Sequence, residues 1–141
     1  MTTQLPVQKL NPDARLPGRA HPGDAGLDLF CIGDVTLNPH EPAKVATGIA
    51  MAIPEGHVGL ICDRSSMGAK GIRTLGGVVD AGYRGEVQVL LINLRNEPYK
   101  ISRGDKIAQM LILPVNLIPT TEVKELSDTV RSSGGFGSTG R

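Results

Sequence analysis

The segment from Gly76 to Gly85 holds residues suited to general-base chemistry. It reads Gly-Gly-Val-Val-Asp-Ala-Gly-Tyr-Arg-Gly, a pattern that predicts a tight hairpin. Glycine allows the backbone to approach a ligand closely, so peptide groups in this segment can read the edge of a flat molecule. Asp80 is predicted at the hairpin tip, where its carboxylate can accept a proton from water; the alternative is an ordinary turn aspartate. Tyr83 is one of only two tyrosines, which favours a specific role for it.

The segment Asp63–Gly68 has the composition of an anion site. It follows an apolar stretch and offers the guanidinium of Arg64, the hydroxyls of Ser65 and Ser66, and backbone N–H groups. Arginine presents a planar fork of donors and a turn can aim amides at one anion, so the combination suits phosphate oxygens. A helix N-cap with a surface arginine is an equally good interpretation.

Two other segments carry polar side chains next to apolar ones. Asp24 and Asp28 lie among small residues at the start of a predicted strand, which taken alone is an Asx-rich turn. Gln109 lies in another predicted strand among apolar neighbours. A buried glutamine needs a hydrogen-bond partner, which is either backbone or ligand.

The chain ends in a segment, residues 127–141, that is rich in Gly, Ser and Thr. It is not a P-loop, because it lacks the Gly-Lys-Ser/Thr ending and the flanking strand and helix. Its small apolar content favours a disordered terminus. Its residues also suit a lid, in which Phe136 stacks on a base while Arg131 and the hydroxyls hold phosphates.

Composition excludes several classes of protein. The 141 residues fit one domain, and 15 basic against 14 acidic residues leave a net charge of +1, which argues against a nucleic-acid-binding protein. The three histidines lack ligand spacing, which disfavours a zinc enzyme, and Cys31 and Cys62 are expected to be free thiols packed as small hydrophobes. The chain shows neither a signal pattern nor an apolar run near the ~20 residues of a membrane span. We therefore expect a soluble, intracellular, cytoplasmic protein without membrane contact.

Eighteen glycines and ten prolines divide the chain into short segments, as is typical of strands joined by turns. Alternating apolar residues predict a strand over 45–53 that ends at the turn Pro54-Glu55-Gly56, with His57–Cys62 as the return strand of a hairpin. The only predicted helix is one short turn over Ser65–Lys70.

Two later segments are predicted to be buried strands. The apolar run within Glu86–Arg95 is too continuous for a half-exposed strand and should be buried on both faces, and Ile107–Val115 is a second buried strand closed by Pro114 and Pro119. Many short strands with turns between them indicate a sandwich, barrel or jelly roll.

Taken together, these segments resemble the trimeric dUTPase family over nearly the whole chain. All five motifs of that family occur in order, and the third and fifth are the most specific. They are AGLDL at Ala25–Leu29, DRSSMG at Asp63–Gly68, GGVVDAGYRGE at Gly76–Glu86, RGDKIAQ at Arg103–Gln109 and RSSGGFGSTG at Arg131–Gly140.

The resemblance implies an all-β subunit, a jelly roll or β-sandwich-like barrel, that forms a threefold homotrimer with active sites built from all three chains. Residues 1–126 would form the core and residues 127–141 a flexible arm that closes over an active site. The implied reaction is the hydrolysis of dUTP to dUMP and pyrophosphate by attack of water on the α-phosphorus, which keeps uracil out of DNA and supplies dUMP for thymidylate synthesis.

The resemblance also implies roles for individual residues. Asp80 would activate the attacking water, and Tyr83 would pack under the deoxyribose and exclude a 2′-hydroxyl. Asp28 would act through water on a Mg²⁺ ion held mainly by the triphosphate, and Phe136 would cover uracil. The implied substrate-binding residues are Arg64, Ser65, Ser66, Thr74, Gly77, Val78, Val79, Tyr83, Gln88, Gln109, Arg131, Phe136, Gly137, Ser138 and Thr139.

Two rival interpretations remain open. dCTP deaminase shares the fold and a similar Arg-Ser-Ser motif, but its catalytic glutamate position corresponds here to Leu90, although Asn93 matches. A leucine cannot shuttle protons, so deamination is disfavoured. The other rival is a binding protein that regulates without hydrolysis, which would not need Asp80 and Tyr83.

Five positions differ from the common pattern of the family. Asp63 stands where proline is frequent, Ser66 where glycine is frequent, and Thr74 where bacterial relatives often have asparagine. Ala81 and Gly82 replace a more usual polar or acidic pair. We expect these differences to shift substrate affinity and to leave catalysis intact.

Overall fold

The computed structural model describes residues 4–140, so residues 1–3 of the predicted core and residue 141 of the predicted arm lie outside the described residues. Short strands dominate, with one five-residue helix. The elements are β1 (Val7–Lys9), β2 (Leu27–Phe30), β3 (Val35–Leu37), β4 (Pro42–Ala46), β5 (Ile49–Met51), β6 (His57–Cys62), α1 (Ser65–Ala69), β7 (Ile72–Leu75), β8 (Val78–Val79), β9 (Gln88–Asn93), β10 (Tyr99–Ile101) and β11 (Lys106–Pro114).

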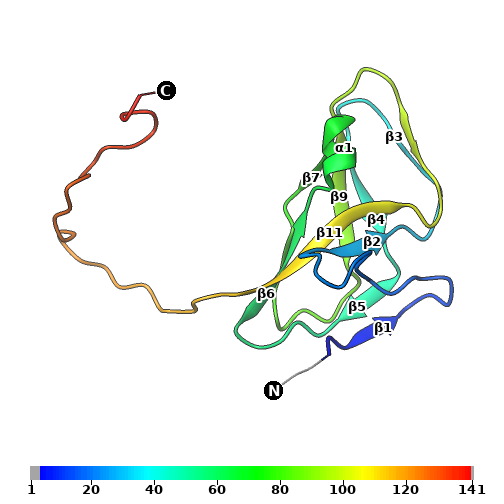
Figure 1. Ribbon diagram of the computed structural model, residues 1–141, viewed down its shortest axis with the longest axis horizontal. Coiled ribbons are helices and arrows are strands. Elements are labelled where there is room, and N and C mark those ends of the chain that lie inside the picture. Colours follow the sequence, from blue (N-terminus) through cyan, green and yellow to red (C-terminus); the bar gives the residue numbers. More distant parts are fainter. Residues whose placement is uncertain (1–3, 141) are drawn as a thin grey trace.

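The strands form two main antiparallel sheets that enclose one core (Figure 1). One sheet has the order β2-β11-β6-β8 and the other β4-β9-β7, and two strand pairs, β1-β5 and β10-β3, complete the fold. The core cluster takes side chains from both main sheets, among them Leu29 and Met110 from the first and Val45 and Leu91 from the second. Burial of such apolar side chains between two sheets is what holds a sandwich together. The predicted all-β jelly-roll or sandwich class is confirmed, and the sheets of residues 4–140 do not close into a barrel.

The predicted strand over 45–53 is divided in two. β4 ends at Ala46 and pairs with β9, whereas β5 starts at Ile49 and pairs with β1. Gly48, with φ 70°, lies at the break, because a left-handed backbone lets the chain turn from one sheet toward another. β6 begins after the expected turn, but it pairs with β11 and β8. The predicted hairpin was therefore wrong in its pairing, although the strand itself is present.

The predicted hairpin over Gly76–Gly85 is also absent. β8 pairs with β6 of the four-stranded sheet, whereas β9 pairs with β4 and β7 of the other sheet. The segment between them crosses from one sheet to the other. Asp80 begins the turn at this crossing, where its carbonyl accepts a hydrogen bond from the Tyr83 N–H at 3.1 Å.

The expectation that residues 86–95 are buried on both faces was wrong for the single chain. Val89 and Leu91 are fully buried, but Leu90 and Ile92 on the other face are half-buried, and Leu94 is 51% exposed. An antiparallel sheet often packs one face on the core and leaves the other free. β11 is likewise buried only in its first part, since Leu113 and Val115 are exposed.

Several local predictions are confirmed. The helix α1 occupies the predicted segment, and the turn before β6 is closed by a hydrogen bond from the His57 N–H to the Pro54 carbonyl. Both cysteines are free thiols, and the Cys31 Sγ donates to the Ser102 carbonyl. The one helix found between residues 4 and 140 is far too short to cross a membrane.

After β11 the chain leaves the body of the molecule as an extended arm (Figure 1). Residues 115–140 contain turns but neither strand nor helix, and apolar side chains on them, such as Leu117, Ile118 and Leu126, are highly exposed. The division between core and arm at residue 127 remains a prediction.

Candidate active site

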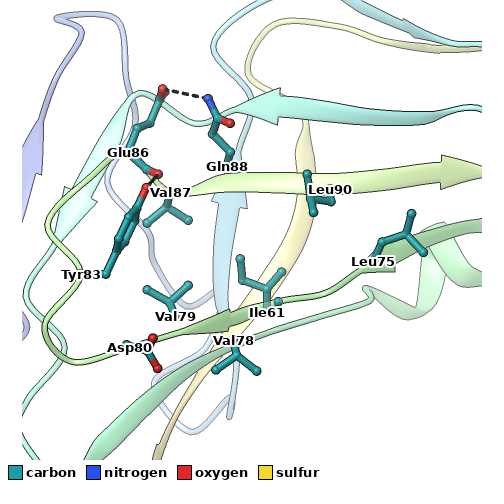
Figure 2. A pocket seen from close by; sticks show the side chains of 11 residues that line it. Ile61, Leu75, Val78, Val79, Asp80, Tyr83, Glu86, Val87, Gln88 and Leu90 are labelled. Carbon is teal, nitrogen blue, oxygen red and sulfur yellow. Dashed lines mark hydrogen bonds between the residues drawn. The ribbon is translucent and has the colours of Figure 1, made fainter.

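A cavity of about 270 Å³ lies where the chain passes between the two sheets (Figure 2). We call it the nucleoside cavity, after the ligand that the family resemblance implies for its residues. Its walls are mostly apolar. Its polar side chains come from the crossing segment, which runs from the end of β8 to the start of β9. The lining residues are Ile61, Leu75, Gly77, Val78, Val79, Asp80, Tyr83, Glu86, Val87, Gln88 and Leu90.

Glycine at position 77 shapes one wall of this cavity. Gly77 has φ 114°, and its carbonyl accepts a hydrogen bond of 2.8 Å from the Ile61 N–H. A Cβ atom at Gly77 would lie 2.7 Å from the Ile61 carbonyl oxygen, closer than real Cβ atoms come. The backbone of β8 is therefore held tightly against β6. Val79 is buried in the core while Val78 is 67% exposed, and both residues of this short strand line the cavity.

Asp80 and Tyr83 lie at the same end of the nucleoside cavity (Figure 2). The Asp80 side chain is exposed to solvent, as a residue that activates water requires. The Tyr83 hydroxyl donates to the Glu86 carbonyl at 2.8 Å, which fixes the ring against the crossing segment. A side chain at Gly85 would collide with the tyrosine ring, so glycine there lets the ring lie flat on the backbone.

Glu86 organises the far side of the crossing segment. One carboxylate oxygen accepts the Gly48 N–H at 2.8 Å, and the other accepts the Gln88 amide at 3.4 Å (Figure 2). Gln88 thus lies at the cavity wall, and a hydrogen bond to Glu86 holds its side chain. Glu86 was not predicted as a side chain of the site, although it is the last residue of the third motif.

A second cavity of about 400 Å³ lies beside α1. We call it the phosphate cavity, after the anion that the sequence predicts for the segment Asp63–Gly68. Three cationic side chains border it, Arg64, Lys70 and Lys106, together with Ser66. Ser65 and Ser66 open the helix with exposed side chains, and no side chain caps it. The cluster of cations with hydroxyls is suited to bind phosphate oxygens. Lys70 and Lys106 were missed in the sequence, but Lys106 lies within the fourth motif.

Asp28 lies between two of these cations. Its carboxylate pairs with the Arg64 Nε at 3.7 Å and with the Lys106 Nζ at 3.1 Å, and it is only 16% exposed. Gln109 lies opposite Asp28 in the β2–β11 ladder, and its side-chain amide donates to the Asp63 carbonyl at 2.8 Å. The expected backbone partner of this glutamine is therefore present. The fold brings Asp28, Arg64 and Gln109 together as the motifs predict.

The donors around Asp28 do not form a complete cation cage. Within residues 4–140, no group of three or more His, Cys, Asp or Glu side chains is placed to hold a metal ion. A single carboxylate next to bound phosphates fits a Mg²⁺ ion that takes most of its ligands from the phosphates and from water. The residues present therefore suit an indirect contact through water.

Other predicted site residues lie apart from these two groups. Thr74 lines neither cavity, because its hydroxyl donates to the Asp63 carboxylate at 2.8 Å. The two cavities have no lining residue in common. The arm carries its site residues away from the core (Figure 1), where all are exposed: Arg131, Phe136, Gly137, Ser138 and Thr139. The Arg131 guanidinium is engaged locally, by the Gly134 carbonyl.

Comparison with known proteins connects this arrangement to one family. The dUTPase family model matches residues 13–140. A deoxyuridine 5′-triphosphate nucleotidohydrolase of Mycolicibacterium gilvum is 51% identical over 149 residues, which cover 99% of this chain and 97% of the relative. The namesake from Clostridium kluyveri is 48% identical over 97% of this chain and 98% of its own length.

Solved structures agree with the sequence relatives. A mutant dUTPase of Staphylococcus bacteriophage 80alpha with dUpNHpp has a TM-score of 0.93 at 32% identity, covering 99% of this chain and 100% of that chain. A mutant dUTPase from phage phi11 of S. aureus, described with a structural Mg(II) ion, has a TM-score of 0.81 at 33% identity and covers 87% of this chain and 98% of its own. The match covers both cavities and the arm, and the chain belongs to the dUTPase family.

Proposed function

We propose that the chain is a dUTP diphosphatase, which hydrolyses dUTP to dUMP and pyrophosphate. The observation that carries the proposal is the nucleoside cavity, in which the two residues of β8, Tyr83 and Asp80 line one space. Further support comes from relatives named as deoxyuridine 5′-triphosphate nucleotidohydrolases and from a family structure that contains dUpNHpp.

The nucleoside cavity would select both base and sugar. Peptide groups from Gly77 to Val79 are held by β6 and by the geometry of Gly77, so they would present fixed donors and acceptors to the uracil edge. Gln88 would contact the substrate from the wall. The Tyr83 ring is fixed by its hydrogen bond to Glu86, and it would pack beneath the deoxyribose and leave no room for a 2′-hydroxyl.

Asp80 would take a proton from the water that attacks the α-phosphorus. Arg64, Ser65, Ser66 and Gln109 would bind phosphate oxygens and offset charge as the P–O bond to the leaving pyrophosphate breaks. Mg²⁺, when bound to the triphosphate, supplies further charge neutralisation, and the carboxylate of Asp28 would orient water near it. Lys106 and Arg64 pair with that same carboxylate and would hold it in place.

We propose that the active unit is a homotrimer in which neighbouring chains complete each site. One dUTP molecule must contact both a nucleoside cavity and a phosphate cavity. In one chain these two cavities have no lining residue in common. Ile92 on the outer face of β9 and Leu94 directly after this strand are apolar and not buried, so they also suit contact with another chain. The arm would reach a neighbour, where Phe136 covers uracil and Arg131, Gly137, Ser138 and Thr139 approach the γ-phosphate.

The free thiols of Cys31 and Cys62 are consistent with a reducing compartment, and we place the enzyme in the cytoplasm. Deamination of dCTP is the rival reaction, but the residue at the position of the deaminase glutamate is Leu90. This side chain lines the nucleoside cavity and cannot transfer protons. No partner other than dUTP, Mg²⁺ and further copies of this chain is needed; neither nucleic acid nor membrane is implied.

The direct test is pyrophosphate release with Mg²⁺, measured in parallel for dUTP, dCTP, dTTP and UTP. We expect rapid release from dUTP alone, because the cavity would select uracil and exclude a 2′-hydroxyl. Absence of release from dUTP would refute the proposal, and ammonia formed from dCTP would then identify a deaminase.

A further inference from the structure

Asp63 lies at the boundary between the two cavities. It follows the end of β6, two residues after Ile61 of the nucleoside cavity and directly before Arg64 of the phosphate cavity. Its side chain is 26% exposed, so it is partly shielded from water but lines neither space. The dUTPase resemblance assigns no role to this residue, which stands where proline is frequent.

The carboxylate of Asp63 binds strand β7. Its Oδ1 accepts the Thr74 N–H at 2.6 Å and the Thr74 hydroxyl at 2.8 Å, and its Oδ2 accepts the Arg73 Nε at 2.9 Å. Burial by itself raises the pKa of Asp63, but the hydrogen bonds from Thr74 and the charge of Arg73 outweigh it, so the pKa lies below its ordinary value. Three hydrogen bonds to an ionised acceptor form a strong local clamp.

The place of β7 in its sheet explains why such a clamp matters. Among the strands of residues 4–140, β7 is an edge strand that pairs with β9 alone, and the Thr74 N–H that donates to Asp63 is on the side away from β9. Asp63 follows β6, a strand of the other sheet. Its carboxylate therefore joins the edge of one sheet to the end of a strand in the other, a contact that no ladder hydrogen bond provides.

Both ends of this connection lead to the proposed binding surfaces. β7 continues through Leu75, which lines the nucleoside cavity, into Gly77. On the other side, the Asp63 carbonyl accepts the side-chain amide of Gln109, and the next residue is Arg64. Asp63 is thus connected to both cavities. Its carboxylate binds β7, which leads to the nucleoside cavity, and its carbonyl binds Gln109 and precedes Arg64 of the phosphate cavity.

We propose that Asp63 is a positioning residue for dUTP binding, which fixes the wall of the nucleoside cavity relative to the phosphate-binding turn of the same chain. This inference rests on the proposed function. Asp63 touches none of the reacting atoms, so its loss weakens substrate binding and leaves the chemistry at Asp80 largely intact. In the proposed trimer each cavity forms part of an active site, so the loss of Asp63 lowers the affinity of every active site for dUTP.

The test compares Asp63→Ala and Asp63→Asn with the wild-type trimer in dUTP hydrolysis and in dUMP binding by calorimetry. We expect Asp63→Ala to raise KM and the dUMP Kd about tenfold with kcat changed less than about threefold. Asp63→Asn keeps an oxygen for Thr74 but loses the charge that pairs with Arg73, so it recovers part of the affinity. Thr74→Val removes one of the three hydrogen bonds and raises KM less than Asp63→Ala.

A matched control is Asp13→Ala, which removes an exposed ion pair with Arg103 at 3.0 Å outside both cavities and leaves KM unchanged. Thermal unfolding and trimer mass are measured for each variant, and Asp63→Asn carries the test if Asp63→Ala does not fold. An unchanged KM in folded Asp63 variants overturns the inference, as does a loss confined to kcat. Failure of the wild type to hydrolyse dUTP would instead overturn the proposed function.

Discussion

The two cavities of this chain recognise their proposed ligands by different physical means. The nucleoside cavity depends on backbone geometry. Gly77 allows β8 to lie close against β6, and hydrogen bonds within the crossing segment hold Tyr83 and Gln88. The phosphate cavity is built on charged side chains, with Arg64, Lys70 and Lys106 around it. Fixed peptide groups give specificity for one base edge, whereas long cationic side chains give affinity for any phosphate.

The difference also concerns how complete each region is. The residues proposed to read the base, to pack under the sugar and to activate water all line the nucleoside cavity. Beside the phosphate cavity, Asp28 pairs with two of its cations, Arg64 and Lys106, and the arm residues proposed to approach the γ-phosphate extend away from the core of the same chain. In the proposed function, one chain therefore holds a nearly complete nucleoside site and an incomplete phosphate site.

The largest expected effect is on the chemistry and arises in the nucleoside cavity. Asp80→Asn should lower kcat about 10²–10⁴-fold, because an amide cannot accept the proton of the attacking water. Affinity for dUTP, measured by calorimetry, should change little, since binding rests on the backbone and the cations. Asp128→Asn in the exposed arm serves as the control. Turnover at the wild-type level in Asp80→Asn would remove Asp80 from its role.

Removal of the arm tests the unfinished region. A chain that ends at Ser127 should lose roughly 10–100-fold in activity, because a lid excludes water and completes the site. Its unfolding temperature should match that of the full chain, because every residue of the core cluster precedes Pro114, the last residue of β11. A truncated protein that unfolds and aggregates would show that the arm is structural.

Glycine at position 77 tests whether the nucleoside cavity depends on backbone geometry. Gly77→Ala places a methyl group against the Ile61 carbonyl at a φ of 114°, so β8 must shift, and dUMP affinity should fall about tenfold or more. Gly82→Ala is the matched control in the same segment, since a Cβ there meets nothing within 4 Å. Equal dUMP affinities for the two variants, measured by calorimetry, would contradict the backbone account.

The smallest expected effect is a pH dependence of stability at the boundary between the cavities. The pKa of Asp63 in the folded chain is below its ordinary value of 3.8. The stability that its carboxylate gives the folded chain is therefore complete above that ordinary value and is lost as pH falls through the folded pKa. The unfolding temperature of the wild type should therefore fall more steeply below about pH 4 than that of Asp63→Asn. Parallel curves for the two proteins would show that this carboxylate is not held as described.

Local sequence features predicted single elements and single motifs well. The helix at Ser65, the strand after Gly56 and the free thiols follow from short-range patterns, and the residues of the third motif do border one cavity. Strand pairing was not predictable in the same way. Whether β6 pairs with β5 or with β11 depends on how two whole sheets pack, which no turn signal encodes.

The sites at the sheet boundary show the same limit. The contact between Asp63 and Thr74 joins residues 11 positions apart across two sheets, and nothing in either local sequence indicates it. The half-buried Leu90 and Ile92 were predicted to belong to a strand buried on both faces, because a surface that contacts another chain, as proposed for this face, can have the composition of a core. Sequence patterns predict apolar surface but not which chain covers it.

The central claim is that the two cavities of one chain serve different active sites, and mixing two inactive variants tests it directly. Asp80→Asn lacks the base and Arg64→Gln lacks the phosphate-binding guanidinium, so each homotrimer should be nearly inactive. If Asp80 and Arg64 of one site come from different chains, trimers refolded from an equal mixture should contain fully wild-type sites, about a quarter of the total by random assortment. We expect the mixture to release pyrophosphate from dUTP at about a quarter of the wild-type rate. A mixture no more active than its separate components would show that Asp80 and Arg64 of one site do not come from different chains.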